Sequence, residues 1–307
     1  MKINTVAVLG VGAIGGYFIW GLSEKLGDRL WVVADGERKE RLEQDGLWIN
    51  NVNYPLHVRT PQEARGADLL LIATKYGALP GVLDEVATIV DDHTTVLSLL
   101  NGIDSEEIVG ARIGMEHILP SIMKIASHRI GNRVVFDGPT SLGVYFGEYD
   151  QREPSERMLA IADLLEGTPL HYHMRKDIKV DLWNKFALNI SRNLPQALLG
   201  CGMGAYADSE HAAALSRMLR DEVIDVAAAR GIDISSLRTT IEVSPVDKSA
   251  RYSTLQDLDA GCHTEIDMFS GALGRMGRES GVPTPCNDFM FHAIRALEEK
   301  NDGKFNY

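Results

Sequence analysis

A run of polar residues at helical spacing is the part of the sequence that most clearly could do chemistry. Lys185, Asn189 and Asn193 follow one another at intervals of four residues, which predicts one polar stripe on a helix. Apolar neighbours such as Phe186 and Ile190 indicate that much of this helix is packed inside the protein. A polar stripe on a largely buried helix needs hydrogen-bonding partners, and a polar substrate in a cleft would supply them. The alternative is a stripe that faces solvent.

Two further polar segments follow in the last third of the chain. Ser253-Thr-Leu-Gln-Asp257 comes first, and His263-Thr-Glu-Ile-Asp267 begins six residues after it ends. Glu265, in the second segment, has helix-forming residues around it and apolar neighbours on each side. Taken by itself, such a carboxylate is more often an exposed surface charge than a site residue.

A glycine-rich loop near the N-terminus has the pattern GxGxxG. It reads Gly10-Val-Gly12-Ala13-Ile14-Gly15, after a short apolar strand at 5–9 and before a helix that extends to about residue 25. In that context the first glycine permits a tight turn, the second lets a pyrophosphate approach the backbone, and the third allows close helix–strand packing. The N–H groups at the start of the helix would face the phosphates. The loop predicts dinucleotide binding; a turn without a ligand is the alternative.

Three further positions lie at the ends of predicted strands. Asp35 ends the second strand, where a carboxylate accepts hydrogen bonds from an adenosine ribose and repels a 2′-phosphate, which favours NAD over NADP. Arg38 and Arg41 follow closely; an ordinary solvated helix face is the favoured interpretation, and contact with a 2′-phosphate is the alternative. Lys75 and Asn101, the latter followed by a glycine, come directly after two later strands, at the edge where such sheets bind ligands.

The elements that position these residues form two domains. Apolar runs without polar alternation at 5–9, 30–34, 68–73 and 94–100, separated by helices, predict a doubly wound parallel sheet of the Rossmann type. The segment 117–147 fits antiparallel extensions of the same sheet, followed by a helix at 154–166 and a strand at 170–173. From 176 the pattern predicts helices at 176–194, 209–230, 234–241, 248–259, 262–280 and 286–299. We therefore predict a dinucleotide-binding domain over 1–173, an all-α catalytic domain over 174–307, and a site in the cleft between them.

Composition narrows the class of protein. The 307 residues include 31 Lys and Arg against 43 Asp and Glu, a net charge of −12 that repels nucleic acid and anionic lipid. Three scattered cysteines and no CxxC pair predict neither a disulfide framework nor a metal site. No apolar run is long enough to span a membrane, and no cleavable leader is recognisable. We expect a cytoplasmic protein that binds small molecules and neither nucleic acid nor membranes.

Taken together, these motifs resemble those of the ketopantoate reductases (2-dehydropantoate 2-reductases) over nearly the whole chain. The specific features are Lys75, Asn101-Gly102, the run Leu-Trp-x-Lys-x-x-x-Asn-x-x-x-Asn at 182–193, and the two segments around Ser253 and Glu265. The resemblance implies an NAD(P)H-dependent reductase that converts 2-dehydropantoate to pantoate in pantothenate synthesis. It also suggests a homodimer.

The resemblance carries roles to individual residues. Lys185 would be the catalytic lysine that hydrogen-bonds the keto oxygen, stabilises the developing alkoxide and delivers the proton. Asn189, Asn193 and Ser253 would hold the substrate, and Glu265 would bind its hydroxyl or orient Lys185. Two other residues would lie beside the nicotinamide cofactor: Lys75, and Asn101, which would also be close to the substrate.

Several positions depart from the family pattern. Asp35 stands where these reductases usually place an arginine for the 2′-phosphate, Leu194-Pro-Gln196-Ala replaces Pro-Leu-Thr-Ala, and Ser270-Gly271 replaces Asn-Gly. The stretch 121–131 also lacks the family's small residues. An NAD-dependent D-2-hydroxyacid dehydrogenase that acts on another 2-keto acid is therefore the second hypothesis. A non-catalytic dinucleotide sensor is the third hypothesis. It is disfavoured because a pure sensor has no need for all five of Lys185, Asn189, Asn193, Ser253 and Glu265.

Overall fold

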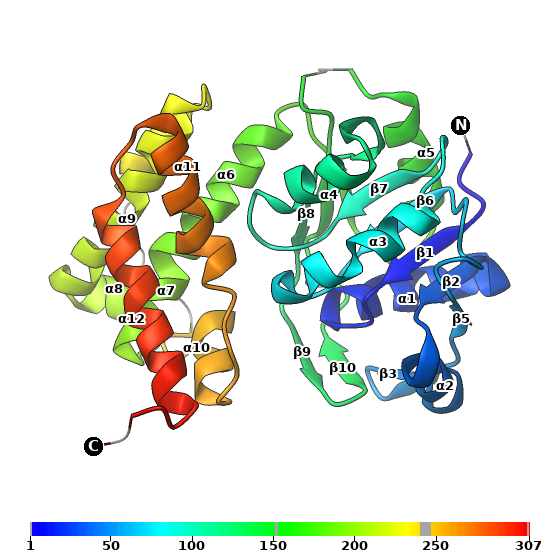
Figure 1. Ribbon diagram of the computed structural model, residues 1–307, viewed down its shortest axis with the longest axis horizontal. Coiled ribbons are helices and arrows are strands. Elements are labelled where there is room, and N and C mark those ends of the chain that lie inside the picture. Colours follow the sequence, from blue (N-terminus) through cyan, green and yellow to red (C-terminus); the bar gives the residue numbers. More distant parts are fainter. Residues whose placement is uncertain (1, 151–152, 240–246, 306) are drawn as a thin grey trace. The chain divides into compact units, whose positions relative to one another are not determined.

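The computed structural model describes residues 2–150, 153–239, 247–305 and 307, and the chain divides into two compact units (Figure 1). The first unit is Met1–Ile178 and the second is Lys179–Tyr307, a division a few residues after the predicted boundary at 173.

A five-stranded parallel sheet forms the centre of the first unit. Its strand order is β5-β2-β1-β6-β7, and every neighbouring pair is parallel. Leu9 pairs with both Val33 and Ile72, so the carboxyl ends of three strands meet at one edge. The strands are β1 (Val6–Leu9), β2 (Leu30–Val33), β5 (His57–Arg59), β6 (Leu69–Ile72) and β7 (Thr95–Ser98). The predicted Rossmann-type sheet is confirmed.

Helices cover both faces of this sheet, which is why β1, β2 and β6 are continuously apolar, whereas the edge strand β5 has an exposed residue at each end. Val8 and Leu71 point to the face packed by α1 (Ala13–Leu26) and α5 (Glu156–Leu165). Leu9 and Ile72 point to the other face, packed by α3 (Leu79–Ile89) and α4 (Ser105–Ile113) (Figure 1). Helix α2 (Gly36–Asp45) follows β2, and short 3₁₀ turns occur at Gly27–Arg29, Tyr76–Ala78 and Met115–His117.

The predicted antiparallel extensions of the central sheet are wrong in part. β8 (Ser121–Lys124), β11 (Gly143–Phe146) and β12 (Tyr172–Met174) form a three-stranded sheet, joined to the central sheet by a bridge between Val96 and Ile118. The hairpin of β9 (Ser127–Ile130) and β10 (Arg133–Phe136) belongs to another sheet, with β3 (Leu47–Ile49) and β4 (Val52–Tyr54).

The β3–β4 turn is joined to β10 of this separate sheet through a contact between residues that are distant in the sequence. Asn50 and Asn51 have φ values of 47° and 67°, a backbone that suits the tight turn of a hairpin and that asparagine tolerates. The Asn50 side chain then accepts a hydrogen bond from the Phe136 backbone N–H, at 3.0 Å, and so ties the turn to β10.

The second unit is helical, as predicted, but several helices are shorter than the sequence pattern indicates. In place of one helix over 176–194, α6 (Ile178–Leu188) leads into a π-helical turn, η4 (Asn189–Asn193), and then α7 (Leu194–Leu199). Pro195 lacks the N–H that would bond the carbonyl four residues earlier, a known cause of an irregular turn just before a proline.

The remaining helices are α8 (Ala205–Asp208), α9 (Glu210–Ala229), α10 (Ser253–Asp259), α11 (Ala272–Ser280) and α12 (Pro285–Asn301). The predicted helix at 262–280 begins only at η6 (Asp267–Gly271), a second π-helical turn, because the Thr264 N–H is bonded to Glu298 of α12 and the Ile266 N–H to the Thr264 hydroxyl instead of to helix carbonyls. The helix predicted at 234–241 is a 3₁₀ turn over Ser235–Thr239, and 240–241 lie outside the described residues. The helix predicted from 248 begins at Ser253.

Candidate active site

The glycine loop crosses the end of β6 at the carboxyl edge of the central sheet. Gly10 has φ 105°, and a Cβ there would lie 2.7 Å from the backbone carbonyl of Ala73. A Cβ on Gly15 would lie 2.0 Å from the Gly10 oxygen. These two glycines are therefore required by packing. A Cβ on Gly12, by contrast, would be 3.8 Å from its nearest neighbour, so the protein leaves room at this position.

The space beside Gly12 suits a pyrophosphate. Gly12 is the N-cap of α1, no side chain caps the helix within the described residues, and its first turn has no acidic residue. The half-buried Ala13 and Ile14 open that turn, whose N–H groups have no acceptor within the helix. The Thr74 hydroxyl, beside the loop, is buried with no hydrogen-bond partner in the described part of the chain. N–H donors, a hydroxyl and room for a ligand fit the dinucleotide that the sequence predicts.

Replacing Gly12 with alanine tests this interpretation. The added methyl group meets no protein atom closer than 3.8 Å, so we expect an unchanged melting temperature. We expect the Kd for NADH to rise about tenfold or more, because the methyl group occupies the approach of the pyrophosphate. Gly10→Ala is the matched control, because its clash with Ala73 should lower the melting temperature. Dye-monitored melting and a fluorescence titration measure the two effects; unchanged NADH affinity in Gly12→Ala would contradict the assignment.

Charged residues of both signs surround the end of β2. Asp35 is the exposed N-cap residue of α2, and its side chain makes no cap hydrogen bond. The pKa of Glu85, on α3, is raised by burial and by the negative charge of Asp35, so these carboxylates lie near each other. The pKa of Arg129, on β9, is lowered by burial and by the positive charges of Arg38 and Arg41. The two arginines and the carboxylate predicted to compete for a 2′-position thus lie at the same end of the sheet.

Lys75 and Asn101 follow β6 and β7 at the same edge as the glycine loop. Lys75 is exposed and Asn101 is half-buried. The hydroxyl of Tyr76 donates to a carboxylate oxygen of Asp104, at 2.7 Å, and so joins the two loops. The structure therefore brings together the predicted residues of the first unit, as the topology of a parallel sheet requires.

A buried carboxylate lies in the first turn of the helix that follows the Asn101 loop. Glu106, in the first turn of α4, is 2% exposed and accepts a hydrogen bond from the Ser105 hydroxyl at 2.8 Å. The Ser105 hydroxyl is in turn 2.8 Å from that of Ser98, the last residue of β7. Burial, with a smaller contribution from the charge of Asp104, raises the pKa of Glu106 to about 7.

This raised pKa predicts a pH-dependent stability. Between about pH 4.5 and 7 the folded chain keeps a proton on Glu106 that the unfolded chain releases, so the free energy of unfolding falls as the pH rises through this window. Glu106→Gln abolishes that loss, and we expect it to gain up to about 3 kcal/mol over wild type at pH 8 and nothing at pH 4.5. Urea unfolding at both pH values measures the difference, with Glu107→Gln, at an exposed position, as control. If the free energy of unfolding depends on pH in the same way for wild type and Glu106→Gln, Glu106 is not the source of the pH dependence.

The polar stripe of the second unit spans the junction of α6 and η4. Lys185 and Asn189 are half-buried, and Asn193 is 5% exposed. A regular helix would rotate by about 80° over the eight residues from Lys185 to Asn193, and the wider π-helical turn offsets this drift. Asn193 therefore does not face solvent, and its side-chain oxygen has no hydrogen-bond partner within the described residues.

Ser253 and the segment of Glu265 belong to elements that pack against this turn. α10, which begins at Ser253, and η6, which follows Glu265, both contact η4. Ser253 is exposed, whereas Glu265 is half-buried and so is not the exposed surface charge that an isolated carboxylate more often is. The structure thus brings the predicted residues of the second unit into one region.

Sequence reasoning missed the residue that fixes the start of α10. Gln196 is fully buried; its amide accepts from the Tyr252 N–H at 2.6 Å and donates to the Ala250 carbonyl at 3.1 Å. This glutamine departs from the family pattern, and that departure was the sequence signal that could have identified it. Its two hydrogen bonds hold the residues that lead into Ser253.

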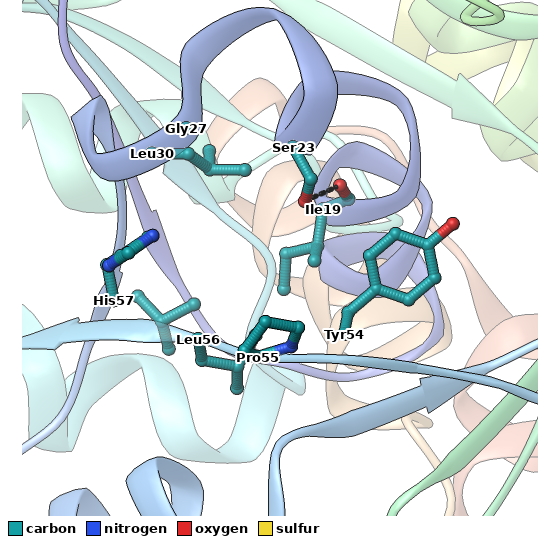
Figure 2. A pocket seen from close by; sticks show the side chains of 9 residues that line it. Ile19, Ser23, Gly27, Leu30, Tyr54, Pro55, Leu56 and His57 are labelled. Carbon is teal, nitrogen blue, oxygen red and sulfur yellow. Dashed lines mark hydrogen bonds between the residues drawn. The ribbon is translucent and has the colours of Figure 1, made fainter.

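Two hollows in the first unit are separate from the predicted site residues. The smaller, about 110 Å³, lies between α1, the start of β2 and the β4–β5 connection, with Ile19, Leu30 and Tyr54 in its wall (Figure 2). The larger, about 490 Å³, is an open groove beside β12 that includes His171 and His173. Neither is lined by a residue predicted for catalysis or for cofactor binding.

Comparison with known families decides the class of this site. The family described as Ketopantoate reductase PanE/ApbA matches residues 6–151, and Ketopantoate reductase PanE/ApbA C terminal matches residues 177–298. The chain belongs to the ketopantoate reductase family. The predicted resemblance and the predicted enzyme class, an NAD(P)-dependent oxidoreductase acting on a CH–OH group, are confirmed.

Relatives of this ketopantoate reductase family member match along its length. The 2-dehydropantoate 2-reductases of Mesorhizobium japonicum and Archaeoglobus fulgidus are 27% and 26% identical, over 95% and 97% of this chain and 97% and 99% of their own. A ketopantoate reductase from Ralstonia eutropha superposes with a TM-score of 0.80 at 23% identity, over 97% of this chain and 99% of its own. D-mandelate dehydrogenase in complex with NADH superposes with a TM-score of 0.81 at 25% identity, over 96% of this chain and 99% of its own.

The described residues offer neither a membrane-spanning helix nor a cluster of metal ligands. No helix there combines the length and hydrophobicity needed to cross a bilayer. No group of three or more His, Cys, Asp or Glu side chains in the same residues is arranged to hold a metal ion.

Proposed function

We propose that the chain reduces 2-dehydropantoate to pantoate, a step of pantothenate and coenzyme A synthesis. The observation that carries this proposal is the stripe of Lys185, Asn189 and Asn193, with a buried side-chain oxygen on Asn193 that has no hydrogen-bond partner among the residues that the structure describes. A substrate hydroxyl would donate to that oxygen and remove the cost of burying it unpaired. Relatives named 2-dehydropantoate 2-reductase, at 26–27% identity, support the same substrate.

The residues of the second unit have complementary roles in this proposal. When bound, the nicotinamide cofactor supplies the hydride for the keto carbon. The Lys185 ammonium stabilises the negative charge that grows on the keto oxygen and transfers its proton there, which completes the hydroxyl group. Asn189, Asn193 and Ser253 hold the carboxylate and hydroxyl of the substrate, and Glu265 binds the substrate hydroxyl or orients Lys185.

The cofactor would lie against the first unit. Gly10, Gly12, Ala13, Ile14 and Gly15 provide the loop and helix start for the pyrophosphate. Asp35 is proposed to hold the adenosine ribose, and Lys75 and Asn101 to lie beside the nicotinamide. We propose NADH as the preferred cofactor, because Asp35 and the nearby Glu85 both repel a 2′-phosphate.

A second candidate keeps the chemistry and changes the substrate. Gln196 replaces a threonine of the family pattern and bonds the residues next to Ser253, so the substrate side of the site differs from that pattern. D-mandelate dehydrogenase with NADH is among the similar structures. These observations favour an NADH-dependent D-2-hydroxyacid dehydrogenase acting on another 2-keto acid as the alternative.

Steady-state kinetics separate the two candidates. The values of kcat/KM are compared for ketopantoate, phenylglyoxylate and 2-ketoisovalerate, each with NADH and with NADPH. Ketopantoate should be the best substrate; if another acid is reduced at least tenfold more efficiently, the second candidate replaces the first.

A homodimer and a cytoplasmic location stay predictions, and sedimentation velocity tests the first of them.

A further inference from the structure

The segment that carries Glu265 is bonded to α12 through a buried carboxylate. Glu298, in the last turns of α12, is 2% exposed. Its Oε1 accepts two hydrogen bonds from Thr264, one from the backbone N–H at 2.7 Å and one from the hydroxyl at 2.6 Å. The residue next to Glu265 is therefore held through both its backbone and its side chain.

A second connection holds the other side of Glu265. The guanidinium of Arg295 donates to Glu298 Oε2 at 2.7 Å and also to the carboxylate of Asp267. The Thr264 hydroxyl additionally accepts from the Ile266 N–H, at 3.3 Å, which closes a small turn around Glu265. Glu265 thus lies between two residues that α12 fixes through one carboxylate–arginine pair.

These contacts differ from ordinary surface ion pairs. Glu298 is almost fully removed from water, and its two oxygens accept from three donors, so each bond is charge-assisted and costly to lose. Burying a carboxylate is unfavourable unless such bonds are made, and none of them is needed to continue α12 itself. Residues 264–266 form no helix whose own hydrogen bonds could fix their backbone. The bonds to Glu298 and Arg295 therefore fix the path of 264–267.

We propose that Glu298 is a positioning residue that sets the place of Glu265 by holding Thr264. The proposal rests on the proposed function, in which Glu265 acts on the substrate or on Lys185. Displacement of a reacting or binding group by about 1 Å can cost up to about 100-fold in rate, so the contact should be visible in kinetics. Cofactor binding, which the first unit provides, should not respond.

Thr264→Val tests the contact without changing the size of the side chain. It removes the hydroxyl that donates a hydrogen bond to Glu298. We expect kcat/KM for the keto acid to fall about 10- to 100-fold, while the Kd for NADH is unchanged. Thr264→Ser keeps the hydroxyl and should restore activity to within a few-fold of wild type. Amide hydrogen exchange of 264–267 should accelerate in Thr264→Val and not in Thr264→Ser.

Glu298→Gln and Glu222→Gln form a matched pair. Glu222 accepts from the N–H groups of Cys286 and Asn287 and so holds the opposite end of α12, away from the segment of Glu265. Both variants should lose comparable stability in urea, but only Glu298→Gln should lower kcat/KM for the keto acid. Equal kinetic losses in the two variants would show a general effect on α12 and overturn the proposal.

A double mutant separates this inference from the proposed function. If Glu298 and Thr264 act through Glu265, then Thr264→Val should add little to the loss caused by Glu265→Gln. Additive losses, or a Thr264→Val enzyme as active as wild type beside an impaired Glu265→Gln, would overturn the positioning role and leave the proposed function intact. A fully active Glu265→Gln would instead remove Glu265 from the proposed function, and the positioning role with it.

Discussion

Replacing Lys185 with alanine is expected to lower kcat for keto-acid reduction by about three orders of magnitude. The half-buried ammonium is the group that the proposed mechanism places at the keto oxygen, where it offsets negative charge and provides the proton. Alanine supplies neither effect. The Kd for NADH should stay within about twofold of wild type, because the proposed cofactor residues belong to the first unit.

Lys179→Ala is the matched control for this loss. Lys179 is a half-buried lysine of the same helix, but six residues from Lys185, so it lies about 120° away around the helix axis. The control makes the same change of charge and side-chain length, and kcat should remain close to wild type. Pre-steady-state and steady-state kinetics, with fluorescence titration of NADH, measure both variants. If Lys185→Ala turns over normally, Lys185 is not the catalytic lysine. If the wild type binds NADH but reduces none of the acids tested, both proposed substrate classes are wrong.

The sequence predicts the core of the first unit well because one physical constraint acts on every residue of its strands. A parallel strand covered on both faces is predominantly apolar, and the runs at β1, β2 and β6 are apolar throughout, while β7 has an apolar centre between Thr95 and Ser98. The glycine loop is partly local: the close packing of Gly15 against the Gly10 oxygen follows from backbone geometry within six residues, whereas the contact of Gly10 with Ala73 depends on a neighbouring strand. The spacing of the glycines is visible in the sequence without knowledge of that distant contact.

The parts that the sequence does not predict depend on contacts between distant residues. β10 pairs in parallel with β3, more than 80 residues earlier in the chain, and this pairing moves the β9–β10 hairpin out of the central sheet. The same holds for the candidate site. Lys185, Asn189 and Asn193 share a stripe that is visible in the sequence, whereas Gln196 and Glu298 act on segments 34 or more residues away and resemble ordinary helix residues until those partners are known.

Cofactor choice is where one residue should change the behaviour of the enzyme most visibly. We expect Asp35→Arg to shift the ratio of kcat/KM for NADPH to that for NADH about 100-fold or more in favour of NADPH. Near a protein surface, one charge pair at about 4 Å contributes about 1 to 4 kcal/mol, and each 1.4 kcal/mol changes an affinity tenfold. The substitution both removes a repulsion of the 2′-phosphate and adds an attraction to it.

The surroundings of Asp35 make this substitution informative. Its side chain is exposed and makes no cap hydrogen bond to α2, so replacing it should cost little stability. Glu85 remains close and continues to repel a 2′-phosphate, which is why Asp35→Arg with Glu85→Gln should shift the ratio further than Asp35→Arg by itself. Asp45→Arg, the same change of charge at the last residue of α2, is the control and should leave the ratio within about threefold of wild type.

A wild-type enzyme that prefers NADPH to NADH would have its 2′-phosphate site at residues other than Asp35. If the wild-type enzyme already favours NADPH, then Asp35 does not set the choice, and the positive charges of Arg38 and Arg41 outweigh its repulsion. In that case Arg38→Ala or Arg41→Ala should raise KM for NADPH at least tenfold while KM for NADH changes little, because only NADPH carries the 2′-phosphate. Measured with Asp35→Arg in one series, these variants assign the 2′-position either to the carboxylate or to the two arginines.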